Sequence, residues 1–266
     1  MFENVSAYSV CAAIAFVCAF AVILILAIRR KAMGFDFFAL CFVTMVGVYF
    51  GAHIMYFLVG LPDFIDYLKT GAVFNLATFI DAMFSYASGL VFYGGLLGGL
   101  LALFITLRSS HFIDSRAWLN NFVVAFPLFH AIGRIGCTLN GCCYGIEYHG
   151  PFAIQYSEEQ IRGSVNADIA DFPRFPIQPL EAVLEFALFI ALLIIYLKTG
   201  TKYSITCIYL FCYSIIRFFD EFLRGDEIRG IWGPFSTSQW ISIFILIGIA
   251  VYLYVTRRKK KAAAVV

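Results

Sequence analysis

The feature that most constrains this chain is a series of long apolar runs, each closed by charged residues. Residues 4–28 carry no charge and end at Arg29-Arg30-Lys31. A helix needs about 20 apolar residues to cross the hydrocarbon layer of a bilayer, so this run is a candidate membrane span. Six further candidate spans follow, at residues 37–61, 82–107, 117–137, 177–197, 203–223 and 238–256. The sequence therefore predicts seven transmembrane helices.

Composition supports this prediction. Of the 266 residues 62% are hydrophobic and only 14% are charged, and the mean hydropathy is +0.86. An ordinary soluble domain carries about 25% charged residues. The composition argues against a soluble globular protein, a disordered chain and a nucleic-acid partner bound through a basic face. We expect an all-α polytopic membrane protein in which residues 1–266 form a single integral membrane domain. The first run exceeds the apolar core of a signal peptide and is interpreted as a retained helix.

The orientation follows from the basic residues of the short loops, which gather on the cytoplasmic side. If the N-terminus lies outside, seven spans place the basic clusters inside the cell: Arg29, Arg30, Lys31, Arg108, Arg116, Lys198, Lys202 and residues 257–261. The C-terminus is then cytoplasmic. Residues 138–176, between spans four and five, are expected to form a small extracytoplasmic cap with a short strand over 151–156.

Ionisable side chains inside spans are costly and mark functional sites by default. In the predicted topology they gather in the outer halves of spans four, five and six: Arg134, Glu181, Glu185, Arg217, Asp220 and Glu221. Residues three or four apart share one face of a helix. This spacing relates His130 to Arg134, Gln178 to Glu181, and Arg217 to Glu221 and Arg224. We therefore expect three helices to present charge to one place.

Two interpretations of this charged cluster remain open. One is a structural network of ion pairs that holds the helices together. The other is a polar cavity that opens toward the outer leaflet. Two arginines in such a cavity suit a phosphate, because the planar guanidinium pairs with phosphate oxygens. The abundant phosphate at this depth is a phospholipid headgroup.

Glycine and cysteine form two further motifs. Glycines at 94, 95, 98 and 99 make a doubled small-xxx-small pattern, which is typical of close helix packing in membranes. Cys137, Cys142 and Cys143 follow span four. Their spacing lacks the second ligand pair of a structural zinc site, so we interpret them as small packing residues, with a metal site or a disulfide as alternatives. We expect no metal and no cofactor.

The segment Gly133-Arg134-Ile-Gly-Cys137-Thr-Leu-Asn140-Gly141-Cys142-Cys143-Tyr-Gly145 resembles the signature of the bacterial prolipoprotein diacylglyceryl transferase family, in its cysteine-bearing Gram-positive version. Four other segments resemble family motifs in the same order: residues 92–95, 176–181, 217–224 and 236–239. The resemblance covers nearly the whole chain. It implies seven helices in a bacterial plasma membrane, with the N-terminus outside.

The resemblance also implies an activity. The family transfers the diacylglyceryl group of phosphatidylglycerol to the lipobox cysteine in the signal peptide of a prolipoprotein, and glycerol phosphate leaves. By this resemblance Arg134 and Asn140 hold the lipid headgroup, and Arg217 stabilises the departing phosphate. Glu221 acts with Arg217 in catalysis. Glu221 and Arg224 together orient the group at this position. The remaining residues implied to bind substrate are Gly94, Gly95, Gln178 and Glu181.

The chain departs from the family pattern at Tyr93, at Ile177, where the family has a threonine, and at Tyr8-Ser9, where many members have Tyr-Gly. Tyr93 stands where the family usually has a histidine, and a tyrosine is a poorer base near neutral pH. As the implied catalytic residue, Tyr93 suggests a divergent member or a paralogue that uses the same lipid on another acceptor. A non-catalytic phospholipid-binding protein and a thiol-redox protein are further alternatives.

Overall fold

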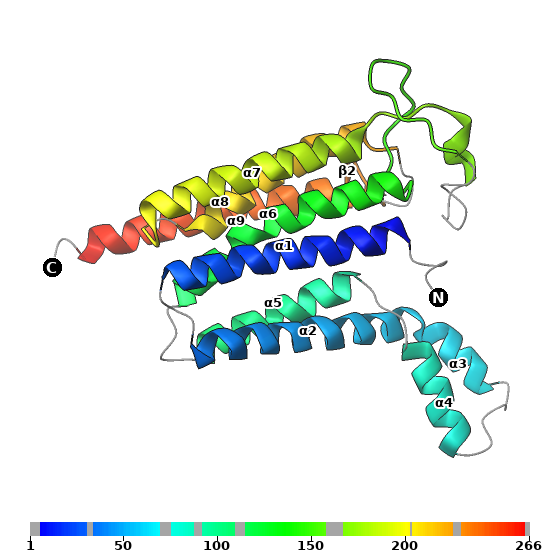
Figure 1. The fold of residues 1–266 in the computed structure, drawn as a ribbon, viewed down its shortest axis with the longest axis horizontal. Coiled ribbons are helices and arrows are strands. Elements are labelled where there is room, and N and C mark those ends of the chain that lie inside the picture. The colour runs from blue at the N-terminus through cyan, green and yellow to red at the C-terminus, as the bar shows by residue number, and fades with distance from the viewer. Residues whose placement is uncertain are drawn as a thin grey trace. The chain divides into compact units, whose positions relative to one another are not determined.

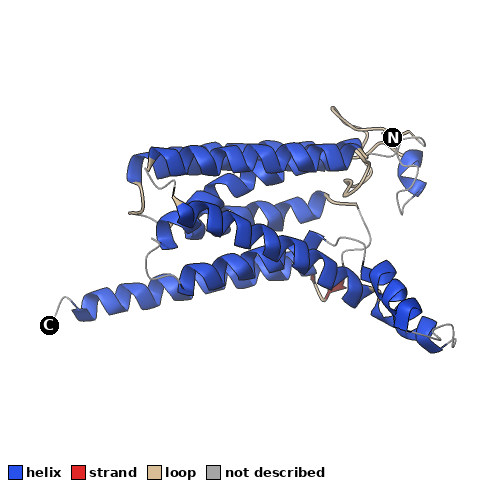
Figure 2. Cartoon of the chain, turned by 60° about the horizontal axis from the view of Figure 1, so that its bottom comes forward, coloured by secondary structure: helices blue, strands red, loops and turns tan. Residues whose placement is uncertain are grey.

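The structure is a computed structural model that describes residues 6–30, 34–69, 76–87, 92–109, 115–157, 167–202, 204–225 and 230–263. The chain divides into two compact units, which are considered separately. The first comprises Met1–Leu26 and Arg116–Val266, and the second comprises Ala27–Ser115. Helices account for nearly all of the regular structure (Figure 2).

Five long helices build the first unit (Figure 1): α1 (Ala7–Arg29), α6 (Ser115–Leu139), α7 (Ile177–Thr199), α8 (Ile205–Asp220) and α9 (Thr237–Ala263). Helix α8 packs between α7 and α9. An apolar core joins four of these helices, with Leu26 from α1, Val124 from α6, Leu192 from α7 and Ile205 from α8. The core fixes how the inward faces of α6, α7 and α8 are turned.

Polar residues define where two of these helices begin. The hydroxyl of Ser204 accepts from the backbone N–H of Cys207 at 3.4 Å and caps α8. Before α9, the Ser236 hydroxyl accepts from the Gln239 N–H, and the Gln239 side chain accepts from the Ser236 N–H at 3.0 Å. This reciprocal pair is a capping box, which satisfies two N–H groups at the helix start. Two short antiparallel strands precede it, β1 (Ile231–Trp232) and β2 (Phe235–Ser236), a hairpin that the sequence did not suggest.

The segment between α6 and α7 is organised by main-chain pairing. Its central stretch, residues 144–148, pairs on one side with residues 173–175 and on the other with residues 223–225. A short 3-10 helix lies within this segment, η1 (Ala167–Asp171), and a second, η2 (Glu221–Leu223), directly follows α8. The expected strand over 151–156 is wrong, because only Ile154 pairs there, in a single bridge to Arg174.

The second unit contains α2 (Phe35–Val59), α3 (Leu61–Lys69), α4 (Leu76–Ala87) and α5 (Phe92–Ser109). Helices α2 and α5 approach so closely that their backbones touch. A Cβ built at Gly98 would lie 2.8 Å from the Cα of Gly51, and one built at Gly94 would collide with the Gly51 carbonyl. The packing expected of the glycine pattern is therefore confirmed, and α2 contributes the matching small surface.

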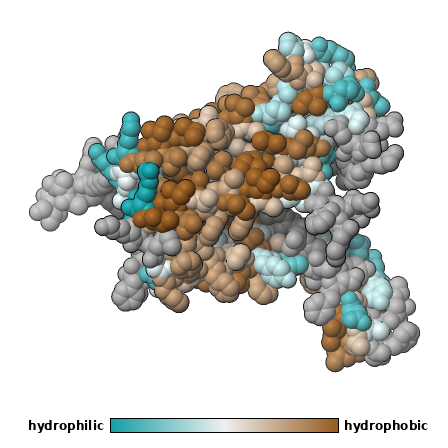
Figure 3. All heavy atoms as spheres, viewed as in Figure 1, coloured by the Kyte–Doolittle hydropathy of each residue, from teal (hydrophilic) through white to brown (hydrophobic). Residues whose placement is uncertain are grey.

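The helices have the character of membrane spans. Five of those described are long and apolar enough to cross a bilayer: Ala7–Arg29, Phe35–Val59, Ala117–Leu139, Ile177–Thr199 and Thr237–Arg258. Hydrophobic side chains cover the middle of the helices of the first unit, and hydrophilic ones gather at the helix ends (Figure 3). The chain is thus an all-α membrane protein. The helix expected over 82–107 is different, because its first residues belong to α4 and its apolar part in α5 is shorter, Gly94–Ser109.

Candidate functional site

Arg134 and Glu181 form the centre of the polar cluster in the first unit. Arg134 lies five residues before the end of α6, and Glu181 lies just past the first turn of α7. The Nη2 of Arg134 donates to Oε1 of Glu181 at 2.9 Å, and the Glu181 side chain is 2% exposed. The two helix faces that the spacing predicted do meet. One guanidinium nitrogen, the Nε of Arg134, is buried without a hydrogen-bond partner among the residues described.

A histidine and a second carboxylate extend this pair along α6 and α7. The Nε2 of His130 lies 3.8 Å from Oε1 of Glu181, and its Nδ1 lies 3.6 Å from Oε1 of Glu185. Glu185 is fully buried. Tyr213 of α8 closes this side of the cluster, with its ring 5.6 Å from the His130 ring. Tyr213 was not singled out from the sequence, although it precedes Arg217 by one helical turn.

Arg217 supplies the second cation, from the last turn of α8. Its Nη2 lies 2.7 Å from Oε2 of Glu221 and donates to Oγ of Ser238 at 3.0 Å. Its Nη1 is buried and has no hydrogen-bond partner in the part of the chain that is described. Asp220, also buried, interacts electrostatically with both Arg134 and Arg217. The two arginines therefore belong to one electrostatic neighbourhood.

Gln178 links the cluster to the loop that follows α6. Its Nε2 donates to the carbonyl of Cys142 and to the hydroxyl of Tyr156, both at 2.9 Å. Burial raises the pKa of the Tyr156 hydroxyl, so it stays protonated. Arg224 is buried, and its backbone pairs with Gly145 of the same loop. Asn140 ends α6, with its N–H bonded to the carbonyl of Gly136 at 3.0 Å.

The other implied site residues lie in the second unit. Gly94 and Gly95 face α2, and a Cβ at Gly95 would lie 3.3 Å from the Val48 side chain. The backbone of Tyr93 belongs to the first turn of α5, but its side chain lies outside the described residues.

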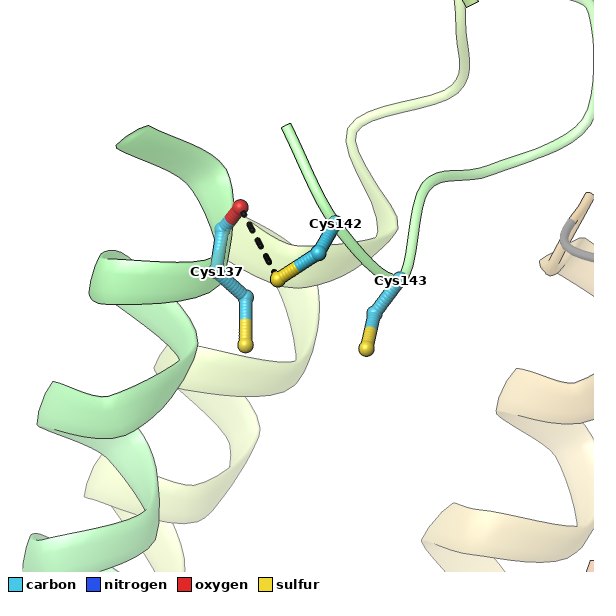
Figure 4. Close-up of side chains that lie close together, drawn as sticks. All are labelled: Cys137, Cys142 and Cys143. Carbon is cyan, nitrogen blue, oxygen red and sulfur yellow. Dashed lines mark hydrogen bonds between the residues drawn. The ribbon is translucent and has the colours of Figure 1, made fainter. Parts of the chain in front are cut away.

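Three thiols lie close together at the end of α6 and in the loop after it (Figure 4). The Sγ atoms of Cys137, Cys142 and Cys143 all lie within 4.8 Å of one another. The Nη1 of Arg134 lies 3.9 Å from Sγ of Cys137. Hydrogen bonds from the other two thiols, together with the nearby charges of Arg134 and Arg224, lower the pKa of Cys143. The spacing in the sequence did not indicate that the three sulfurs converge.

The sequence of this chain is similar to that of a known protein family. A family model described as prolipoprotein diacylglyceryl transferase matches residues 2–255. The phosphatidylglycerol–prolipoprotein diacylglyceryl transferase 2 of Clostridium perfringens is 38% identical over 164 residues, which are 61% of this chain and 60% of that protein. The chain thus spans less than two thirds of that relative.

Two longer matches extend the likeness. The phosphatidylglycerol–prolipoprotein diacylglyceryl transferase of Clostridium tetani is 29% identical over 236 residues, 87% of each chain. The protein of the same name from Dehalococcoides mccartyi strain CBDB1 is 30% identical over 230 residues, 79% of this chain and 81% of that one. The resemblance carried by residues 133–145 is confirmed, and the chain belongs to the prolipoprotein diacylglyceryl transferase family.

Proposed function

We propose that this chain transfers the diacylglyceryl group of phosphatidylglycerol to the thiol of a prolipoprotein lipobox cysteine. In this reaction the thiolate sulfur attacks the glycerol carbon that bears the phosphate. A carbon–sulfur bond forms, the carbon–oxygen bond breaks, and the departing glycerol phosphate keeps the electron pair. The thiol proton leaves to a base. The relatives described above are named as phosphatidylglycerol–prolipoprotein diacylglyceryl transferases, which supports the donor, the transferred group and the class of acceptor in this proposal.

The observation that carries the proposal is the incomplete pairing of the two arginines. Each side chain is 12% exposed and pairs with one buried carboxylate, yet each keeps a buried nitrogen without a partner among the described residues. A buried donor left unsatisfied costs about 1–3 kcal/mol. A phosphate oxygen would satisfy it, and fixed cations stabilise charge that grows in a transition state. The cluster therefore suits an anionic headgroup better than a closed ion-pair network.

The proposed roles follow from this arrangement. Arg134 and Asn140 bind the headgroup, with Glu181 and Gln178 holding Arg134 and the loop in place. Arg217 stabilises the leaving phosphate. Glu221 and Arg224 orient this cation. Gly94 and Gly95 contribute to substrate binding through the shape that their close contact with α2 gives to the glycine segment. Tyr93 takes the place of the catalytic base. No cofactor is required.

For the whole chain we propose a single integral membrane domain over residues 1–266. Its seven spans place the N-terminus outside and the C-terminus in the cytoplasm of a bacterial cell, with residues 138–176 as the extracytoplasmic cap. Helix α8 has only 16 residues, and η2 would complete its crossing. The proposed partners are phosphatidylglycerol in the surrounding membrane and a prolipoprotein signal peptide.

The decisive experiment incubates the purified protein with labelled phosphatidylglycerol and a lipobox peptide. We expect lipidated peptide and free glycerol phosphate in equal amounts. Arg217→Ala should lower turnover far more than lipid affinity, whereas Arg134→Ala should lower both. Losing one charge-assisted contact to the phosphate, about 2–4 kcal/mol, corresponds to about a 30- to 1,000-fold loss of rate. Lys at either position should restore only part of the lost rate, because lysine lacks the planar guanidinium group that pairs with two phosphate oxygens.

The control is Arg258→Ala, since Arg258 stacks on Tyr254 near the end of α9, outside the polar cluster. A folded Arg134→Ala or Arg217→Ala protein with the wild-type rate would refute the proposal. Affinity losses without turnover would indicate a passive lipid-binding protein. Release of glycerol phosphate with another acceptor only would indicate the paralogue.

A further inference from the structure

The convergence of three thiols at the end of α6 has no part in the transfer reaction proposed above. Cys137 lies in the last turn of α6, and Cys142 and Cys143 lie in the loop after it. Figure 4 shows the three sulfurs close together, with the Cys142 thiol turned toward the Cys137 carbonyl, to which it donates at 3.8 Å. All three are free thiols, with Cys137 buried and the other two partly buried.

The backbone holds these sulfurs in place before any ligand binds. Cys143 has a φ of 57°, a left-handed conformation that is uncommon for any residue except glycine. The N–H of Cys142 bonds to the carbonyl of Cys137 at 3.1 Å, and Gln178 fixes the Cys142 carbonyl at 2.9 Å. Because an unfavourable φ persists only where the surroundings impose it, the loop is a built feature rather than a chance approach of side chains.

The distances suit one metal ion. Zinc–sulfur bonds of about 2.3 Å at tetrahedral angles place their sulfurs about 3.8 Å apart. The three sulfurs lie within 4.8 Å of one another, so binding needs them to close by less than about 1 Å. A disulfide would use two of the three thiols and leave the third without a role.

The charges agree with this arrangement. Three thiolates and one divalent cation leave one net negative charge. The guanidinium of Arg134, with its Nη1 3.9 Å from the Cys137 sulfur, lies where it offsets that charge. Thiolate sulfurs select soft cations, such as zinc or cuprous ions, over magnesium or calcium.

We propose that Cys137, Cys142 and Cys143 form a binding site for one thiophilic metal ion of the zinc class, with a solvent molecule as the fourth ligand. This proposal replaces the expectation that these cysteines are small packing residues with the metal-site alternative. The site is inferred from the sulfur positions and the neighbouring charge and not from the transfer reaction, although Arg134 would belong to both sites.

The test uses the full-length protein, purified in detergent and fully reduced. Titration with Cd²⁺ alone should produce sulfur-to-metal charge-transfer absorption that saturates at one equivalent. Protein loaded beforehand with Zn²⁺ should bind Cd²⁺ with a lower apparent affinity, because the two ions compete for the same sulfurs. Proton release, measured by calorimetry in two buffers, should accompany binding, since the thiols bind as thiolates. Cys143→Ser should weaken binding by at least about a hundredfold, because losing even an outer-shell partner costs 10- to 100-fold.

The matched control is Cys212→Ser on α8, a free cysteine outside the cluster, which should leave the titration unchanged. A second measurement does not depend on variants. Bound Zn²⁺ should protect three thiols of the native protein from alkylation, and mass spectrometry should assign them to residues 137, 142 and 143. The proposal is overturned if Cys143→Ser binds Cd²⁺ as tightly as the native protein does. It is also overturned if the native protein shows no stoichiometric binding, or if Zn²⁺ protects none of the three.

Discussion

The guanidinium of Arg134 reaches from α6 to the carboxylate of Glu181 on α7 across 2.9 Å, in a place almost closed to water. Such a pair is not strong evidence of stability, because desolvating both charges offsets most of their attraction. Removing one partner and leaving the other charge buried and unpaired destabilises the protein strongly. The pair is therefore better explained as a device that holds one cation in a fixed position than as a source of folding energy.

This interpretation predicts a specific pattern in a double-mutant cycle. Arg134→Met and Glu181→Met should each destabilise the protein by about 3–5 kcal/mol, since each leaves a buried charge without its partner. The double variant should be more stable than either single variant. Thermal unfolding in detergent measures all three. Additive losses would mean that the two side chains act independently.

Ser238 should act as a positioning residue for Arg217. Its hydroxyl accepts from Nη2 of Arg217 at 3.0 Å, and a hydrogen bond to a charged group contributes about 1.5–3 kcal/mol. Ser238→Ala should lower kcat about 10- to 150-fold while KM for the lipid changes little. Ser242→Ala, one turn further along α9, removes a hydroxyl that bonds only to the Ser238 carbonyl in the described contacts and should keep the native kcat. Equal effects of the two variants would exclude a role through Arg217.

The contact between α2 and α5 should be intolerant of a single added carbon. A Cβ at Gly98 would lie 2.8 Å from the Gly51 Cα, so Gly98→Ala should destabilise the protein by about 1–3 kcal/mol. Gly248→Ala in α9 is the control, because nothing lies within 4 Å of its added Cβ. This variant should be neutral or slightly stabilising, as alanine is favoured over glycine within a helix. A native melting temperature for Gly98→Ala would contradict the close backbone contact.

The topology is tested with two reporters. One fused after residue 261 should be cytoplasmic, because basic clusters remain on the cytoplasmic side. One inserted near Asp168, in the expected cap, should be extracytoplasmic. Protease protection in spheroplasts or a pair of compartment-specific enzymes gives the readout. Finding both reporters on one side of the membrane would contradict seven spans.

Apolar runs predicted the helices well where the run and the helix coincide. The run over 4–28 became α1, and the run over 177–197 became α7, each within a few residues. The run over 82–107 is shared between two helices, since residues 82–87 belong to α4 and residues 92–107 to α5, with residues 88–91 outside the described part of the chain. Hydropathy reports burial in lipid, but it does not tell one apolar helix from parts of two.

The sequence predicted which site residues share a face of one helix. It predicted less well which residues of different helices come into contact. A spacing of four residues placed His130 and Arg134 on one face, and the structure agrees. The same spacing relates Arg217 to Glu221, and this pair is present at 2.7 Å. The pairing of Arg134 with Glu181, in contrast, depends on how α6 and α7 are rotated, and packing in the core decides that. The meeting of the three thiols depends on a left-handed residue at Cys143, which a spacing of cysteines does not reveal.

The loop after α6 lies between two other chain segments and bonds to both through its backbone. The N–H of Ile146 donates to the carbonyl of Leu223, and its carbonyl accepts from the N–H of Phe175, at 3.0 and 2.9 Å. These bonds join the ends of α6, α7 and α8 without using any side chain. Backbone hydrogen bonds do not depend on side-chain identity, so substitutions in this loop can change the groups that it exposes without loosening the three helix ends that it joins. If the proposed function holds, a family member could in this way change its acceptor while it keeps the same scaffold.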